Sequence, residues 1–298
     1  MADNHRRSAY LERFPQTFSI QHKVTPDTEK RRLHLHEQLE LIVAVSDNMG
    51  CQYETGSLPI PAGSVLLLDA LTPHYIYKSS PGGMADRYVL YFSSEYVSSL
   101  SVPQLNLLRC FYLGRTTVPG LVSPPEGERL AIRRLLDEML LSAARAERHS
   151  PGSLEALTYG MQTRFLLGQL LALLNRMCPC GGVQASSSPE TVNTALFIKG
   201  YIQEHYSQPL RADDLARKFY ISKTQLYKTF HQVLGTSVGS YITQVRIIKA
   251  KDLLINSPYP VELIAGKVGY QNLSAFSRAF KAHVGVTPNA FRRRGDGP

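Results

Sequence analysis

The spacing of apolar positions changes along the chain, and this change divides the sequence into regions. From about residue 33 to residue 92, short apolar runs alternate with Gly, Pro and Ser, as in GSLPIPAGSVLLLDALTPH. The clearest runs cover residues 39–45, 65–68 and 88–92. Many short strands separated by turn residues are typical of a small barrel or sandwich.

Helical periodicity replaces these short runs after residue 125. Apolar residues recur every three or four positions over 126–147 and 154–177, and Pro151–Gly152 separates the two stretches. We therefore expect an antiparallel helical hairpin at 126–177. Both helices are apolar over much of their circumference, so they must pack on the strands or on a second subunit.

The next segment, residues 178–190, has no periodicity and is rich in Gly, Ser and Pro, which is typical of a linker. Beyond it, residues 191–298 read as helices broken by short turns. The predicted fold class is therefore α+β. A β-barrel at 1–125 is followed by the hairpin, the linker and an all-α domain.

The all-α region contains two copies of one pattern, each predicting a short helix, a tight turn and a second helix. In order, the two copies contain Leu215, Ala216, Phe219, Ser222, Leu226, Phe230 and Gly235, and then Ile264, Ala265, Val268, Leu273, Phe276, Phe280 and Gly285. Between them, residues 238–255 predict one helix of 18 residues, about 27 Å long. Such a rod could hold the two second helices near the roughly 34 Å that separates successive major-groove faces of a duplex.

The charge of the chain is concentrated in this same region. Residues 191–298 carry 15 basic and 6 acidic side chains, hence the whole net charge of +9, whereas residues 1–190 carry 18 of each. A basic segment joined to a neutral one indicates a module that binds a polyanion. RNA is disfavoured because its major groove is too deep and narrow to admit a helix.

Each predicted second helix has one apolar side and one side with cations and small polar groups. Cations suit phosphates, and amide, hydroxyl or guanidinium groups suit base edges. One such helix would normally be no more than a solvated surface, but two copies in a basic segment favour DNA binding. The candidates are Lys223, Thr224, Tyr227, Lys228, Gln271, Asn272, Ser274, Arg278 and Lys281.

The run DDLARKFYISKTQLYKTFHQVLGTSVGSYITQVRIIKAKDLL, followed by VELIAGKVGYQNLSAFSRAFKAHVGVTPNAFRR, resembles the AraC/XylS family of bacterial transcription regulators. The resemblance covers about Leu196 to Arg293. It implies two helix-turn-helix motifs joined by a helix, both inserting into the major groove. By position it implies base-facing roles for Thr224, Tyr227, Lys228, Ser274, Ser277 and Arg278.

Three residues depart from the pattern of that family. Lys228 stands where the family often has Arg, which would weaken bidentate reading of guanine. Tyr220 replaces a common turn glycine that the second copy keeps as Gly269, and Arg211 stands where a Ser or Thr N-cap is usual. These departures affect local geometry and the target sequence rather than the class.

The amino-terminal region contains H-x-H-x3-E at 34–40 and Thr-Pro-His at 72–74, which resembles the cupin barrel. The resemblance implies that two histidines, a glutamate and a later histidine can hold a first-row transition metal. We expect instead no metal or other cofactor, and an effector pocket in the barrel mouth that suits a hydroxylated ligand such as a sugar. The residues expected to line it are His34, His36, Glu40, His74, Tyr75 and Tyr77, of which the first four are the metal candidates.

The leading hypothesis is a homodimeric transcription regulator, an activator, that binds a double-stranded DNA operator and a small-molecule effector. The hairpin would form the dimer, and an activator would also contact RNA polymerase. We expect no enzymatic activity and no catalytic residues. Two alternatives stay open: a metal-dependent cupin enzyme with an accessory DNA-binding domain, and an architectural DNA-binding protein that needs no ligand.

Membrane insertion and export are not predicted. The longest apolar-rich stretch, LLGQLLALL at 166–174, is far shorter than the about 20 residues that span a bilayer. The start, MADNHRRSAYLERFPQ, lacks the apolar run of a secretory signal. The expected location is therefore the cytoplasm.

Overall fold

The computed structural model divides into two compact units, Met1–Ala185 and Ser186–Pro298. The division falls inside the predicted linker, of which residues 179–188 lie outside the described part of the chain. The structure describes residues 10–12, 17–26, 33–53, 56–70, 72–79, 84–102, 105–112, 120–178 and 189–295.

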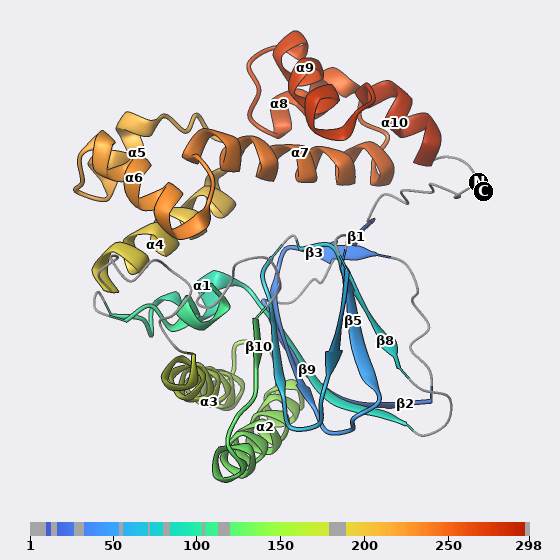
Figure 1. Ribbon diagram of the computed structural model, residues 1–298, viewed down its shortest axis with the longest axis vertical. Coiled ribbons are helices and arrows are strands. Elements are labelled where there is room, and N and C mark those ends of the chain that lie inside the picture. Colours follow the sequence, from blue (N-terminus) through green and yellow to red (C-terminus); the bar gives the residue numbers. More distant parts are fainter. Residues whose placement is uncertain are drawn as a thin grey trace. The chain divides into compact units, whose positions relative to one another are not determined.

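The first unit contains two five-stranded sheets (Figure 1). In spatial order, the first sheet consists of β1 (Tyr10–Glu12), β3 (His34–His36), β8 (His74–Lys78), β5 (Met49–Tyr53) and β6 (Gly56–Ile60). The second consists of β10 (Gly120–Val122), β7 (Val65–Leu68), β4 (Leu39–Ala44), β9 (Ala85–Phe92) and β2 (Phe18–Thr25). Only the β1–β3 pairing is parallel among the strand pairs of the described residues.

The apolar core of this unit lies between the two sheets. It draws Ile42 from β4 and Val89 from β9 in one sheet, and Met49 and Cys51 from β5 in the other. Within the described ranges, no strand pairing joins the two sheets, so the predicted barrel is seen as two facing sheets rather than a closed hydrogen-bonded barrel.

Helices cover the outer face of the second sheet, which is why every residue of β4 is buried. The elements are α1 (Ser94–Ser98), the 3-10 helix η1 (Leu107–Phe111), α2 (Glu126–Glu147) and α3 (Leu154–Met177). Helices α2 and α3 match the predicted hairpin and pack against each other. Helix α2 also packs on β2. The Tyr88 hydroxyl on β9 donates to Asp137 Oδ1 of α2 at 2.6 Å.

The second unit is all-helical, as predicted. It contains α4 (Pro189–His205), α5 (Ala212–Lys218), α6 (Lys223–Leu234), α7 (Val238–Asn256), α8 (Val261–Lys267), α9 (Leu273–Val284) and α10 (Pro288–Gly295). Figure 1 shows α5 and α6 at one end of α7, and α8 and α9 at the other. No helix among the residues described in either unit combines the length and apolar character that a membrane span requires.

The predicted repeat is confirmed by the lengths of its helices: α5 and α8 have 7 residues each, and α6 and α9 have 12 each. Ser222 caps α6 by accepting from the Gln225 amide. Its counterpart in the second copy is Asn272 and not Leu273. Leu273 is 40% exposed, so it lies at the margin of the apolar side of α9.

Candidate functional site

Helices α6 and α9 each present one polar face to solvent. On the opposite face, Leu226 and Phe230 of α6 and Phe276 and Phe280 of α9 are fully buried. Of the ten predicted DNA-binding residues, only Ser277 is half-buried, and the exposed ones are Lys223, Thr224, Tyr227, Lys228, Gln271, Asn272, Ser274, Arg278 and Lys281. The periodicity of the apolar residues therefore assigned the exposed faces correctly.

The two polar faces correspond position by position, because residues 50 apart occupy equivalent places on α6 and α9. Thr224 corresponds to Ser274, and Lys228 corresponds to Arg278. Each helix thus carries a hydroxyl close to its amino end and a cation one turn later. Hydroxyls and amides can bond to base edges or phosphates, and the guanidinium of Arg278 can bond to guanine in a bidentate manner.

Two of the ten residues also have partners within the unit. The Lys223 ammonium lies 3.1 Å from the carboxylate of Asp213 on α5, and this hydrogen bond raises the pKa of Lys223. The Asn272 side-chain oxygen accepts from the Ala275 amide at 2.8 Å and so caps α9. Asn272 was predicted as a DNA contact, and the structure gives it a capping role.

Arg246 of α7 joins the two copies, and sequence reasoning missed it. Its Nε donates to the Tyr206 carbonyl at 2.8 Å, and Nη2 donates to the Gln208 carbonyl at 2.9 Å, in the loop before α5. The same guanidinium lies against the turn of the second copy, where a Cβ on Gly269 would be 2.9 Å from Arg246 Cζ. The joint therefore restricts how the two copies can move relative to each other.

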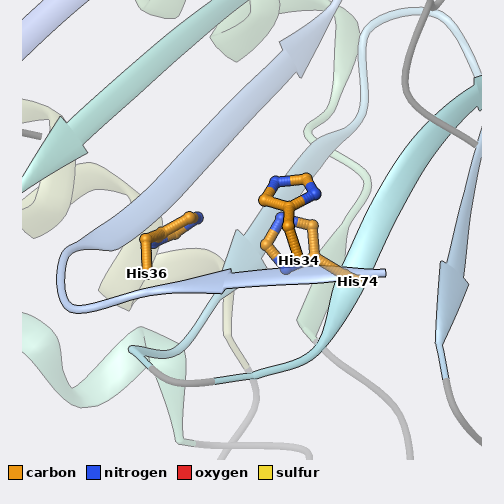
Figure 2. A group of neighbouring side chains, drawn as sticks. All are labelled: His34, His36 and His74. Atoms are coloured by element: carbon orange, nitrogen blue, oxygen red, sulfur yellow. The ribbon is translucent and has the colours of Figure 1, made fainter. Parts of the chain in front are cut away.

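A cluster of three buried histidines lies in the first unit. Figure 2 shows the rings of His34, His36 and His74 gathered beside β3, and their candidate ligand atoms all lie within 4.8 Å of one another. The His34 and His74 ring centroids are 4.5 Å apart. His34 and His36 come from β3 and His74 from β8, and these strands pair at His34 and His74.

Glu40 of β4 completes the cluster from the opposite sheet. Its Oε2 lies 3.0 Å from His36 Nε2 and 2.8 Å from His74 Nε2. Burial raises the pKa of Glu40, but the charges and hydrogen bonds of His74 and His36 outweigh burial and hold that pKa well below its ordinary value. His36 and Glu40 are close in sequence. They lie on two strands that the turn at residues 37–38 connects.

The second nitrogen of two rings faces a backbone carbonyl. His36 Nδ1 donates to Gln38 O and His74 Nδ1 donates to Thr72 O, both at 2.8 Å. A neutral imidazole carries one N–H, so each neutral ring would present the lone pair of Nε2 toward Glu40. A lone pair that faces a carboxylate is unfavourable. A proton on each Nε2, or a cation among these atoms, would make the contacts favourable. Metal-binding histidines commonly donate their second nitrogen to a carbonyl in this way, so the donor set fits a divalent transition metal.

Tyr75 and Tyr77 do not join this cluster, which corrects the predicted pocket. Successive residues of a strand point to opposite faces. His74 is fully buried and Ile76 packs on the core between the sheets, so the two tyrosines lie on the outer face of β8. There the Tyr77 ring occupies the space beside Gly50, where a Cβ would be 2.3 Å from its ring carbon Cζ.

Comparison with known proteins finds one family model that matches part of the second unit. A helix-turn-helix domain family matches residues 215–294. The Msm operon regulatory protein of Streptococcus mutans is 35% identical over 127 residues, which are 43% of this chain and 45% of that protein. The solved C-terminal domain of AraT, a response regulator from Geobacillus stearothermophilus, is 36% identical with a TM-score of 0.34, covering 34% of this chain and 84% of that one.

The chain thus spans less than half the length of the Msm regulator. A shorter relative is matched almost completely. Regulatory protein SoxS of Escherichia coli K12 is 36% identical over 94 residues, which are 32% of this chain and 88% of SoxS. With the two helix-turn-helix copies described above, this match shows that the chain belongs to the AraC/XylS family of transcription regulators.

Proposed function

We propose that the chain is a sequence-specific regulator of transcription that binds double-stranded DNA and whose first unit senses a small molecule. The observation that carries the proposal is the pair of exposed polar faces on α6 and α9, held at the two ends of α7. Helix α7 has 19 residues, hence a length of about 28 Å. That length suits two helices that enter successive major grooves on one side of a duplex.

A double variant tests this assignment. Lys228→Ala with Arg278→Ala removes one cation from each polar face, and we expect binding to a duplex selected by the wild-type chain from a random library to fall by at least tenfold. The control is Arg134→Ala on an exposed position of α2, which should leave binding unchanged. Equal binding by the double variant and the wild-type chain would show that these helices do not contact DNA.

Salt dependence tests the electrostatic part of the proposal separately. Lysine and arginine contacts to phosphates release counterions, so the logarithm of the binding constant should fall linearly as the logarithm of salt concentration rises. The slope for the wild-type chain should be steeper than for the double variant. A slope near zero would contradict binding through the basic faces.

Sensing is proposed for the space between the two sheets, the part of the first unit that resembles a cupin. A ligand that controls DNA binding must bind more tightly to one arrangement of the units than to another. A broad set of metabolites that leaves DNA affinity unaltered would instead favour an architectural DNA-binding protein. We also propose that the chain activates transcription and contacts RNA polymerase. A transcription assay with a promoter that carries the selected site tests both.

A homodimer is proposed through the exposed face of α3. Leu154, Leu157, Met161 and Phe165 are 76%, 58%, 45% and 56% exposed, and they line a hollow of about 670 Å³. Large contiguous apolar patches on soluble proteins mark interaction sites. We infer that the occupant is a second copy of the chain, because one helical row can pack on its own copy across a two-fold axis.

The second candidate function is a metal-dependent enzyme with an accessory DNA-binding unit. The observation in its favour is the cluster of three imidazoles, of which His36 and His74 contact Glu40. Elemental analysis of protein purified without chelator separates the two candidates. A stoichiometric transition metal together with turnover of a substrate would favour the enzyme, and a metal without turnover would make it part of the sensor.

A further inference from the structure

Arg87 of β9 is a buried cation that points into the space between the two sheets. Arg87 is only 8% exposed. Ala85, Val89 and Tyr91, which share its face of β9, belong to the core between the sheets, and residues two apart on a strand point the same way. The next residues along the strand point outward, since the Tyr88 hydroxyl reaches α2.

The neighbouring edge strand, β2, has its polar side turned toward the same space. Lys23 pairs in register with Arg87, Gln21 with Val89, and Thr25 with Ala85, and directly opposed residues share a face. The outward residues of β2 are more apolar: the Phe18 ring stacks on Tyr96 at 5.0 Å, and the His22 ring stacks on Tyr88 at 4.4 Å. An edge strand of a two-sheet domain normally buries its apolar side between the sheets. The inner side of β2 is polar instead, which suits contact with polar groups.

The carboxylates nearest to Arg87 are bound to other residues. Asp86 is on the outer face, where its Oδ1 accepts from His22 Nε2 at 2.7 Å. Glu40 is held by His36 and His74. Within the described ranges, no carboxylate lies within 4.0 Å of the Arg87 guanidinium. Burial lowers the pKa of Arg87, and Tyr91, Glu40 and Asp86 oppose that effect.

The hydrogen bonds of Arg87 leave one edge of its guanidinium directed to other acceptors. Nη1 donates to Thr25 Oγ1 at 3.1 Å and to the Ala85 carbonyl at 3.3 Å. Both bonds use one nitrogen and neutral acceptors. The edge formed by Nε and Nη2 has the parallel N–H geometry that binds a carboxylate in a bidentate manner. A buried charge is costly unless an opposite charge accompanies it.

We propose that Arg87, with Thr25 and Lys23 of β2, binds the carboxylate of a small organic anion, and that this anion is the effector of the first unit. The site rests on the sensing part of the proposed function and gives it a ligand class. It differs from the predicted sugar pocket, because charge and not hydroxyl groups would provide most of the recognition.

Matched pairs of acids and neutral analogues test the proposal on the full chain. The probes are benzoate against benzamide, succinate against succinamide, and gluconate against sorbitol, each at constant ionic strength. Thermal unfolding of the first unit should shift to higher temperature with at least one acid and not with its neutral partner. Titration calorimetry should then give a Kd for that acid.

Variants assign the effect to Arg87. Arg87→Gln should weaken binding of that acid by roughly tenfold or more, because the charge-assisted bonds are lost, and Arg87→Lys should retain part of the affinity. Should Arg87→Gln fail to fold, Lys23→Gln on the edge strand should still weaken binding several-fold. Arg134→Gln, on the exposed side of α2, is the control with the same change in charge.

The proposal is overturned if no acid stabilises the unit more than its neutral partner, or if Arg87→Gln and Lys23→Gln bind the acid as the wild-type chain does. Its failure is distinguishable from failure of the proposed function. If sorbitol or another neutral compound stabilises the unit and changes DNA affinity, sensing holds and the anion class is wrong. Loss of ligand-free DNA binding in the Lys228 and Arg278 double variant is independent of all these results.

Discussion

The turn residue with positive φ is Tyr220 in the first copy and Gly269 in the second. We expect substitutions at these two positions to have opposite effects on stability. Tyr220 has φ 54° and is 96% exposed, whereas Gly269 at the equivalent position has φ 90°. A non-glycine residue in this conformation costs about 1–2 kcal/mol. Tyr220→Gly should therefore raise the free energy of unfolding of the second unit by up to about 1 kcal/mol, after the entropy of glycine in the unfolded chain is counted.

Gly269→Ala should instead destabilise this unit by more than about 1 kcal/mol. The new Cβ would be strained by the positive φ and would lie 2.7 Å from the Tyr206 carbonyl oxygen. Gly266→Ala on α8 is the matched control, because its Cβ would meet nothing within 4 Å. The stability of both variants is measured by denaturant unfolding, with hydrogen exchange of the α8 and α9 amides as the readout. Equal stability of the two alanine variants would contradict the close contact.

Arg278 and Lys281 lie one turn apart on α9, and their chemistry predicts different losses on removal. Arg278→Ala should cost about 1–3 kcal/mol of binding and relax discrimination at one base pair, because a guanidinium can read guanine. Lys281→Ala should weaken binding evenly across sequences and lower the salt slope by about 1, because an ammonium acts on phosphates. Anisotropy titrations with single-base variants of the selected duplex measure both, and identical profiles would contradict the distinction.

At the scale of an element, each second helix is anchored by buried aromatic side chains. Phe230 of α6 and Phe280 of α9 are fully buried. Truncation of either to Ala leaves a cavity and should cost about 3–5 kcal/mol. Hydrogen exchange should show local opening of α6 or α9, respectively. Leu273→Ala, at a residue 40% exposed, is the control, and native-like melting of the Phe variants would disprove the predicted stripes.

The helices could be predicted from the sequence because their signals are local. Periodicity and the breaker at Pro151–Gly152 predicted the bounds of α2 and α3, and Gly235 and Gly285 end α6 and α9 in the left-handed conformation. The basic faces followed from the same periodicity. Local pattern alone did not distinguish an N-cap from a base contact at Asn272, since an amide side chain suits both.

The strands and the sites of the first unit depend on contacts between distant segments. His36 and Glu40 are near in sequence, yet His74 meets them only through pairing of β3 with β8. The outward direction of Tyr75 and Tyr77 depends on which face of β8 packs on the core. Arg87 and Arg246 carry no sequence motif, because the register of β2 with β9 and the approach of two turns give them their roles.

At the scale of the whole molecule, the exposed row on α3 predicts concentration-dependent assembly. Leu157→Glu with Phe165→Glu places two negative charges in the centre of the row, and burial of unpaired charges opposes packing on a second copy. Sedimentation velocity should show a dimer for the wild-type chain and a monomer for this variant, with the first unit folded in both. Leu130→Glu, at an exposed position of α2 outside the row, is the control and should stay dimeric.

Loss of the dimer should also lower affinity for a duplex that carries two copies of the selected site. Once one unit of a dimer is bound, the second unit binds its site as an intramolecular step. The avidity of the dimer can therefore exceed the affinity of either unit by about 10²–10⁴. The Leu157 and Phe165 variant should keep its affinity for a single site, because α6 and α9 are untouched, and should lose only the gain from the second site. A wild-type chain that is monomeric at all concentrations, or a variant that keeps the two-site gain, would assign the α3 face to another partner.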